Sequence, residues 1–123
     1  MAKFNSFEEI LSWQKARALN KDIYQITINN TSFSKDFGLR DQIRRSSISI
    51  SSNIAEGFER ETTKEFIRFL YIAKASAGEF RSQLYLAFDL EYINDIEFNK
   101  LTLEVNEVSK LISGLIKYLS STL

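Results

Sequence analysis

Two carboxylates, an amide and two arginines are the residues whose types and spacing best suit chemistry. They are Arg45, Asn53, Glu56, Arg60 and Glu79. Paired carboxylates beside cations are what acid-base or metal chemistry requires. The same types also build structure, because a carboxylate accepts hydrogen bonds from turn amides and an arginine bridges two helices with a bidentate grip. We interpret the set as an inter-helix polar network rather than as a catalytic site.

The composition removes most catalytic chemistry from this chain. The sequence of 123 residues contains no histidine and no cysteine. That excludes disulfides, thiolate or imidazole metal sites, cysteine nucleophiles and serine-histidine triads. Several serines lie between residues 43 and 60, but no base is available to activate them. We therefore expect no enzyme, no cofactor and no small-molecule substrate, and carboxylates alone remain as the one way to hold a metal.

Two groups of basic residues are candidates for binding nucleic acid or a protein partner. The first group is Arg40, Arg44 and Arg45, and the second is Arg60, Lys64 and Arg68. The chain has 16 basic and 16 acidic residues, so it lacks the cation surplus of a protein that wraps nucleic acid by bulk charge. Acidic residues are interspersed, and a solvated charged face is the alternative interpretation. These acidic residues are Asp41, Glu59, Glu61 and Glu65.

The elements that must position these residues are long helices. The chain has no proline and four glycines, which favours few helices joined by short turns within one domain, residues 1–123. Apolar spacings of three and four predict helices over 7–28, 39–56 and 63–92, and a fourth after a cap at Asn94. Serine, threonine or asparagine followed three residues later by glutamate predicts capping boxes at Ser6, Thr62 and Asn94. The heptad pattern predicts an all-α fold, an antiparallel up-down-up-down four-helix bundle.

Two segments leave a choice open. Residues 47–51 alternate serine and isoleucine like a strand, but Ile43, Ile50 and Ile54 recur at helical multiples, and no second run alternates as a partner. We expect a helix whose serines keep one side thin, so that a neighbour approaches closely, and which ends at Gly57 in the left-handed conformation. Residues 29–38 should form a loop with Phe33 and Phe37 packed on the bundle.

The third predicted helix carries a second apolar stripe beside its core seam. Its members are Ile67, Tyr71, Lys74, Gly78, Arg81, Tyr85, Phe88 and Tyr92. One stripe of about 100° suffices for a monomeric bundle, so the second predicts a subunit interface. We assign that interface to Ile67, Tyr71, Arg81, Tyr85, Phe88 and Tyr92. The alternative is that the chain's own loops cover the stripe.

Several motifs resemble those of the bacterial 23S rRNA intervening-sequence proteins. They are Asn53-Ile54-Ala55-Glu56-Gly57 with Arg60, Ala73 with Ser76 and Glu79, Phe37-Gly38-Leu39 with Gln42-Ile43-Arg44-Arg45, and Trp13 with Ala16. The resemblance implies a four-helix bundle that forms a ring, a homopentamer. A similar protein, the accessory variability determinant of diversity-generating retroelements, binds a reverse transcriptase and nucleic acid.

These observations give two expectations for function. The first is a non-enzymatic, ring-forming interaction module that binds RNA or a nucleic-acid-processing enzyme. The alternative, which the resemblance implies, is an accessory nucleic-acid-binding subunit of a reverse transcriptase. The amino terminus has no apolar h-region and no stretch approaches a membrane span, so we expect a cytoplasmic protein without membrane partners.

Overall fold

The structure, a computed structural model, describes residues 4–123, and all the regular structure in that range is helical, as predicted. The elements are a 3-10 turn η1 (Phe7–Glu9) and helices α1 (Leu11–Asn29), α2 (Thr31–Lys35), α3 (Phe37–Phe58), α4 (Thr63–Asp89) and α5 (Asp95–Ser121). None of the helices in this range is long and apolar enough to cross a membrane.

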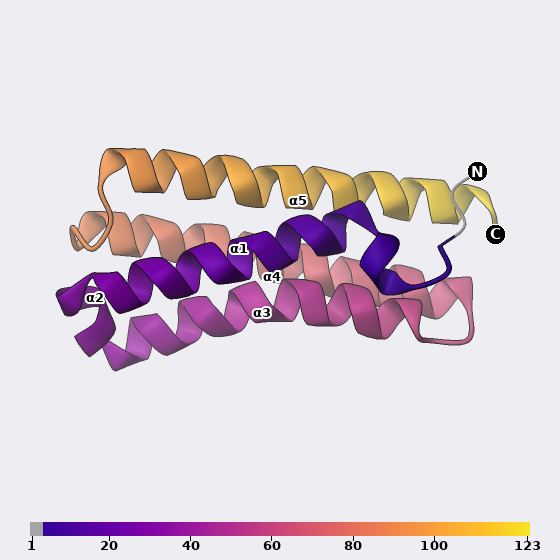
Figure 1. Ribbon diagram of the computed structural model, residues 1–123. Coiled ribbons are helices and arrows are strands. Elements are labelled where there is room, and N and C mark those ends of the chain that lie inside the picture. Colours follow the sequence, from indigo (N-terminus) through magenta and orange to yellow (C-terminus); the bar gives the residue numbers. More distant parts are fainter. Residues whose placement is uncertain (1–3) are drawn as a thin grey trace.

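The four long helices lie side by side along one axis (Figure 1). α1 packs against α3 and α5, and α4 packs against the same two helices. The turn between α3 and α4 lies at the end of the molecule that holds both termini, whereas α2 and the connection from α4 to α5 lie at the other end (Figure 1). The core draws on all four helices, with fully buried residues such as Leu19, Ile50, Phe80 and Ile112.

The helix ends follow local hydrogen bonding. Asn94 and Glu97 form the complete predicted capping box, and Thr62 caps α4 by accepting from Glu65 N at 3.1 Å. The box predicted at Ser6 is wrong, because the Glu9 carboxylate accepts from Asn5 N at 3.0 Å and the Ser6 side chain caps nothing. Residues 7–9 therefore form a 3-10 turn, and α1 begins four residues later than predicted, at Leu11.

The segment between α1 and α3 differs from the predicted loop. It contains α2, whose Phe33 is fully buried and stacks on Tyr92 with 5.1 Å between ring centroids. Phe37 is 63% exposed, so the prediction that it packs on the bundle is wrong. α3 begins at Phe37, because the Asp36 carboxylate caps it by accepting from Leu39 N at 3.1 Å.

α3 and α4 approach each other closely where α3 ends. Gly57 lies inside α3 and has no positive φ, so the prediction of a left-handed cap is wrong. A Cβ added at Gly57 would lie 2.6 Å from Phe69 Cβ and 3.3 Å from the Phe66 carbonyl oxygen. The glycine is therefore needed for the approach of α4 rather than for backbone freedom.

We expect Gly57→Ala to lower the free energy of unfolding by about 2 kcal/mol, the usual cost of forcing an extra group into a packed contact. Urea unfolding followed by circular dichroism measures it. The matched control is Gly38→Ala, whose Cβ would meet only Asp36 Oδ1 at an ordinary 3.7 Å and should leave stability unchanged or slightly raised. Equal effects of the two substitutions would contradict the close approach.

Charged side chains join α1 to α5. Lys100 Nζ lies 3.2 Å from the carboxylates of both Asp22 and Glu104. Burial and the neighbouring Asp22 carboxyl raise the pKa of Glu104 above its ordinary value of 4.5, although Lys100 opposes the shift. The folded protein therefore holds a proton on Glu104 at pH values where the unfolded chain has released it.

Because the folded state binds more protons in this range, the free energy of unfolding should fall as pH rises from about 4.5 through the raised pKa of Glu104. Glu104→Gln should flatten that fall, as measured by urea unfolding between pH 4 and roughly 8. The control Glu107→Gln, which removes the half-exposed partner of Lys15, should keep the wild-type slope. An unchanged slope in Glu104→Gln would show that Glu104 is not its source.

Candidate nucleic-acid interface

Small polar side chains hold α1 against α3. Asn20 of α1 accepts from Ser47 Oγ at 2.6 Å and donates to Ser51 Oγ at 3.0 Å. Ser47 and Ser51 are buried, and because their side chains are short, α1 and α3 can pack closely here. This contact places the start of α3, with its arginines, beside the second half of α1.

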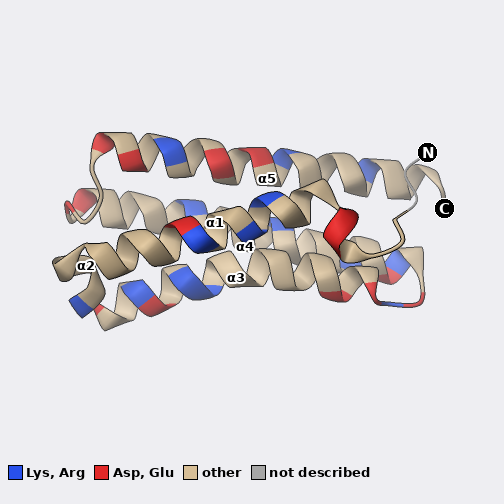
Figure 2. Cartoon of the chain, in the orientation of Figure 1, with Lys and Arg blue, Asp and Glu red and all other residues tan. Residues whose placement is uncertain are grey.

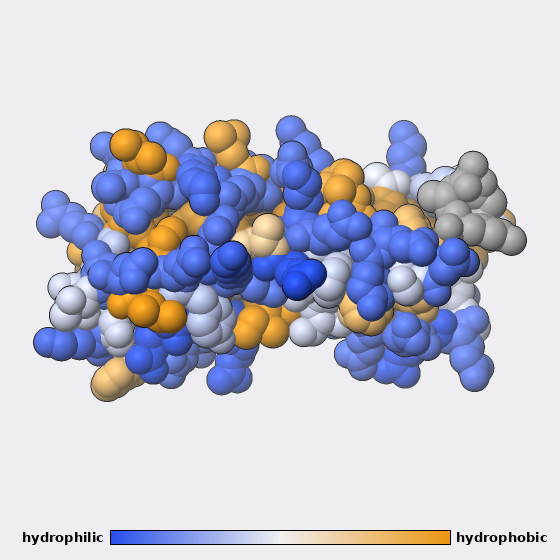
Figure 3. All heavy atoms as spheres, in the orientation of Figure 1, coloured by the Kyte–Doolittle hydropathy of each residue, from blue (hydrophilic) through white to orange (hydrophobic). Residues whose placement is uncertain are grey.

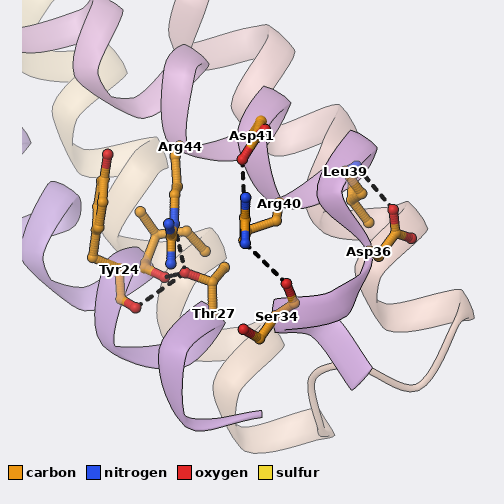
Figure 4. A network of polar contacts seen from close by, with 9 residues as sticks. Tyr24, Thr27, Ser34, Asp36, Leu39, Arg40, Asp41 and Arg44 are labelled. Carbon is orange, nitrogen blue, oxygen red and sulfur yellow. Dashed lines mark hydrogen bonds and ion pairs between the residues drawn. The ribbon is translucent and has the colours of Figure 1, made fainter. Parts of the chain in front are cut away.

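Arg44 is held in a fixed orientation at this junction (Figure 4). Its Nε donates to Thr27 Oγ1 at 2.8 Å, and its guanidinium lies 4.4 Å from the centre of the Tyr24 ring. The Thr27 hydroxyl is itself anchored to main-chain carbonyls of Ile23 and Tyr24, at 2.9 and 3.0 Å. The side chain is thus positioned without a carboxylate, which leaves the two terminal nitrogens as donors for a ligand.

Arg40 makes contacts of a different kind (Figure 4). Its Nε donates to Asp41 Oδ1 at 2.9 Å and its Nη1 to the Ser34 carbonyl at 3.1 Å. The guanidinium also lies 4.7 Å from the ring centre of exposed Phe37. Arg40 therefore ties α2 to α3 and neutralises Asp41, the one acidic residue of the predicted first group.

Arg45 completes the surface. It is exposed, and within residues 4–123 neither Arg44 nor Arg45 pairs with a carboxylate. An open hollow of about 340 Å³ lies between the two helices. Its lining residues are Tyr24, Asp41, Arg44, Arg45 and Ile48. An aromatic and an apolar side chain beside guanidinium groups without carboxylate partners suit a nucleotide. Its base can stack on the hollow while its phosphate binds arginine.

α1 adds two cations that sequence reasoning missed. Arg17 and Lys21 precede Tyr24 by seven and three residues, which places them on the same side of α1. Figure 2 shows basic segments of α1 and α3 in adjacent positions on one side of the molecule. The α1–α3 basic face is defined as Arg17, Lys21, Arg40, Arg44 and Arg45. The sequence contained a signal for these two cations, since Arg17, Lys21 and Tyr24 share a helical spacing and lie outside the apolar stripe.

The second predicted group lies at the other end of α3, and both of its arginines are neutralised. Arg60 pairs with Glu56 at 3.3 Å, and Arg68 grips both oxygens of Glu65 at 2.9 and 3.2 Å. The hydrogen bond from Arg68 lowers the pKa of Glu65. Both guanidinium groups also lie 4.7 Å from the ring centre of Phe69. Lys64 is exposed beside them, and the group corresponds to the solvated charged face considered as the alternative.

The predicted polar network is wrong in most of its contacts. Only Glu56 and Arg60 meet, and both belong to the same turn rather than to two helices. Arg45 lies apart on the surface, Asn53 donates to the Ser49 carbonyl at 2.7 Å, and Glu79 accepts from Gln83 at 3.4 Å.

Serines make the actual bridges between α3 and α4. Ser46 donates to Gln83 Oε1 at 2.7 Å, and the Ser49 and Ser76 hydroxyls lie 2.9 Å apart. Serine hydroxyls of α3, rather than the predicted charged pairs, therefore join these two helices.

The predicted interface stripe of α4 is partly used within the chain. Phe88 packs on Phe98 of α5 with ring centroids 4.8 Å apart, and Arg81 donates to Asn106 of α5 at 3.2 Å. The other members divide in the same way. Ile67 is partly buried against the core, Tyr92 donates to Asp36 at 3.0 Å, and Tyr71 and Tyr85 are 56% and 55% exposed. Helix α5 therefore covers one edge of the stripe, where the half-exposed Tyr85 ring also meets Phe98 with 5.2 Å between ring centroids.

Comparisons with known proteins agree with this architecture. Among curated proteins, none matches the chain. A crystal structure of a protein with unknown function from the S23 ribosomal protein family of Bacteroides thetaiotaomicron matches with a TM-score of 0.79 and 29% identity. The match covers 87% of this chain and 99% of the other. The family model for the 23S rRNA-intervening sequence protein matches residues 8–114, and the chain belongs to that family.

Proposed function

We propose that this chain is a non-enzymatic interaction module. It works as an antiparallel, up-down-up-down four-helix bundle that assembles into a ring and binds RNA, or RNA held by a processing enzyme, through the α1–α3 basic face. The proposal of a non-enzymatic role rests on the absence of histidine and cysteine from the sequence.

The orientation of Arg44 is the observation that carries the binding proposal. Tyr24 and Thr27 fix its guanidinium, so little side-chain entropy is lost when a phosphate binds. Arg45, which pairs with no carboxylate of residues 4–123, lies along the same hollow. A single chain with zero net charge offers few phosphate contacts. A ring would repeat the basic face around its axis, so that the phosphate contacts of all subunits contribute to the affinity for one RNA.

The outward side of α4 supports assembly. Tyr71 and Tyr85 are exposed, and Gly78 between them would accept a Cβ without meeting any atom within 4 Å. A helix-interior glycine costs roughly 1 kcal/mol relative to alanine. Contacts within the subunit do not explain that cost, whereas close approach of a neighbouring subunit does.

Removing arginines from the basic face should weaken RNA binding in a salt-dependent way. We expect Arg44→Ala and Arg45→Ala each to reduce affinity for a structured RNA hairpin by about fivefold at low salt and to lower the slope of log affinity against log salt by about one. Tyr24→Leu should weaken binding without changing the charge, because Arg44 loses its support. Fluorescence anisotropy across a salt series measures all three.

The matched control is Arg68→Ala, which removes the same charge from the neutralised group and should change affinity little. Failure of the wild-type protein to bind at low salt would refute the proposed function. Binding that depends on Arg68 but not on Arg44 would move the site to the other end of the bundle.

Substitution of the outward tyrosines should break the assembly. We expect Tyr71→Glu and Tyr85→Glu to convert the oligomer to monomers, because each places a charge in a contact that excludes water. The control is Ile96→Glu, at a residue of α5 that is 78% exposed and outside the stripe. Light scattering gives the mass, and a wild-type monomer or an unchanged mass in both tyrosine variants would refute the α4 interface.

A further inference from the structure

Two aromatic rings of α1 each have an arginine lying over them. The Arg44 guanidinium lies 4.4 Å from the centre of the Tyr24 ring, as described above. The exposed Arg17 guanidinium lies 5.8 Å from the centre of the Trp13 ring. Both rings are partly buried and pack against the hydrophobic core, so neither ring moves freely. Each pair therefore presents a flat guanidinium group beside a fixed aromatic ring.

The two arginine–aromatic pairs lie on the same side of α1. Tyr24 follows Trp13 by eleven residues, which is close to three full turns of an α-helix. The helical rise places these two rings about 16 Å apart along the helix. That distance spans at most about five nucleotides, because the bases of a stacked strand are about 3.4 Å apart and those of an extended strand are further apart. Figure 3 shows hydrophilic side chains along α1, with smaller hydrophobic patches beside them.

The charges along this side of α1 suit a chain of phosphates. Within residues 4–123 Arg17, like Arg44, pairs with no carboxylate. Lys21 is exposed and lies between the two pairs in the sequence. We define the α1 track as Trp13, Arg17, Lys21, Tyr24 and Arg44. The acidic η1 turn, which contains Glu8 and Glu9, precedes α1 and limits the track at that end.

Aromatic rings and guanidinium planes favour unpaired bases over a duplex. An unpaired base can stack on either kind of plane, whereas a duplex keeps the faces of its bases inside its own stack. Ile48 lines the hollow beside Tyr24 and is 40% exposed, so it adds apolar surface that a phosphate backbone does not use. Charge alone would favour the duplex, which carries more phosphates for its length. A preference for single strands would therefore have to come from stacking.

We propose that the RNA bound by the α1–α3 basic face is single-stranded where it crosses the α1 track. One base stacks at the Arg17–Trp13 pair and another at the Arg44–Tyr24 pair, while the phosphates between them lie near Lys21. This inference rests on the proposed function, the binding of RNA by the same face. A hairpin meets the requirement through the unpaired bases of its loop.

Affinity for matched RNA probes tests the proposal. The probes are a non-self-complementary single strand of about twelve nucleotides, its blunt-ended duplex, and an abasic strand of the same length that keeps the phosphates but lacks the bases. We expect the single strand to bind at least about fivefold more tightly than either of the other two, because only it offers free bases for stacking. Fluorescence anisotropy at low salt measures all three affinities.

The protein carries its own reporter for one of the two stacks. Trp13 is the one tryptophan of the sequence, so the intrinsic tryptophan fluorescence comes from this position alone. We expect the single strand to quench this fluorescence at saturation, because a base then lies against the Arg17–Trp13 pair. The abasic strand at saturation should leave the fluorescence unchanged.

A charge-conserving variant separates stacking from electrostatic attraction. Arg17→Lys keeps the positive charge but removes the guanidinium plane. It should weaken binding of the single strand about fivefold and binding of the duplex less than about twofold. The matched control is Arg68→Lys, at an arginine that pairs with Glu65, and it should not change the affinity for the single strand. Circular dichroism confirms that both variants are folded.

The outcomes distinguish this inference from the proposed function. Equal affinities for single strand and duplex, equal affinities for normal and abasic strands, or unquenched tryptophan fluorescence at saturation would each overturn the inference and leave RNA binding by the basic face intact. Equal effects of Arg17→Lys and Arg68→Lys would overturn stacking at the Arg17–Trp13 pair. Absence of binding by both single strand and duplex would overturn the inference and the proposed function together.

Discussion

The close packing of α3 between α1 and α4 is the constraint on which the rest of the structure depends. α3 turns isoleucines toward the core and serines toward both neighbours. Because these side chains are short, α1 and α4 come near enough for direct hydrogen bonds, Ser47 to Asn20 on one side and Ser46 to Gln83 on the other. At the last turn even a methyl group would be too large, since Gly57 lies against Phe69. Buried hydroxyls cost little in such a seam because nearly all of them are paired.

The basic residues at the two ends of α3 have different surroundings. Its first turns lie beside α1, where Arg44 meets an aromatic ring and a hydroxyl instead of a carboxylate. Its last turns lie beside the start of α4, where Glu56 and Glu65 neutralise Arg60 and Arg68. Each predicted group has three basic residues, but within residues 4–123 two of the first group pair with no carboxylate, Arg44 and Arg45, against one of the second, Lys64. Net charge alone does not distinguish these two cases.

The surface of the bundle shows where its own contacts end. Phe88 packs on Phe98 of α5, and Tyr92 bonds to Asp36, while Tyr71 and Tyr85 remain more than half exposed. Gly78 and Gly114 both lie inside long helices and have open space beside them. A glycine inside a helix lowers helix stability relative to alanine, and contacts among residues 4–123 do not explain these two glycines. In the assembly proposed above, a neighbouring subunit would lie against Gly78.

The sequence by itself determined the helical class, the family and most helix ends, because hydrophobic spacing and capping residues act over a few neighbouring residues. It identified Asn94 as a complete capping box and the segment around Ile50 as a helix. It also named Arg44 and Arg45 as candidates, but it did not distinguish them from Arg60 and Arg68. The pairing of Arg60 and Arg68 is local, since Glu56 and Glu65 lie only four and three residues before them. Only the tertiary structure showed that Arg44 meets Tyr24 and Thr27, because these two residues lie on another helix, α1. The role of Gly57 was likewise invisible in the sequence, because it depends on how closely Phe69 of α4 packs against the end of α3.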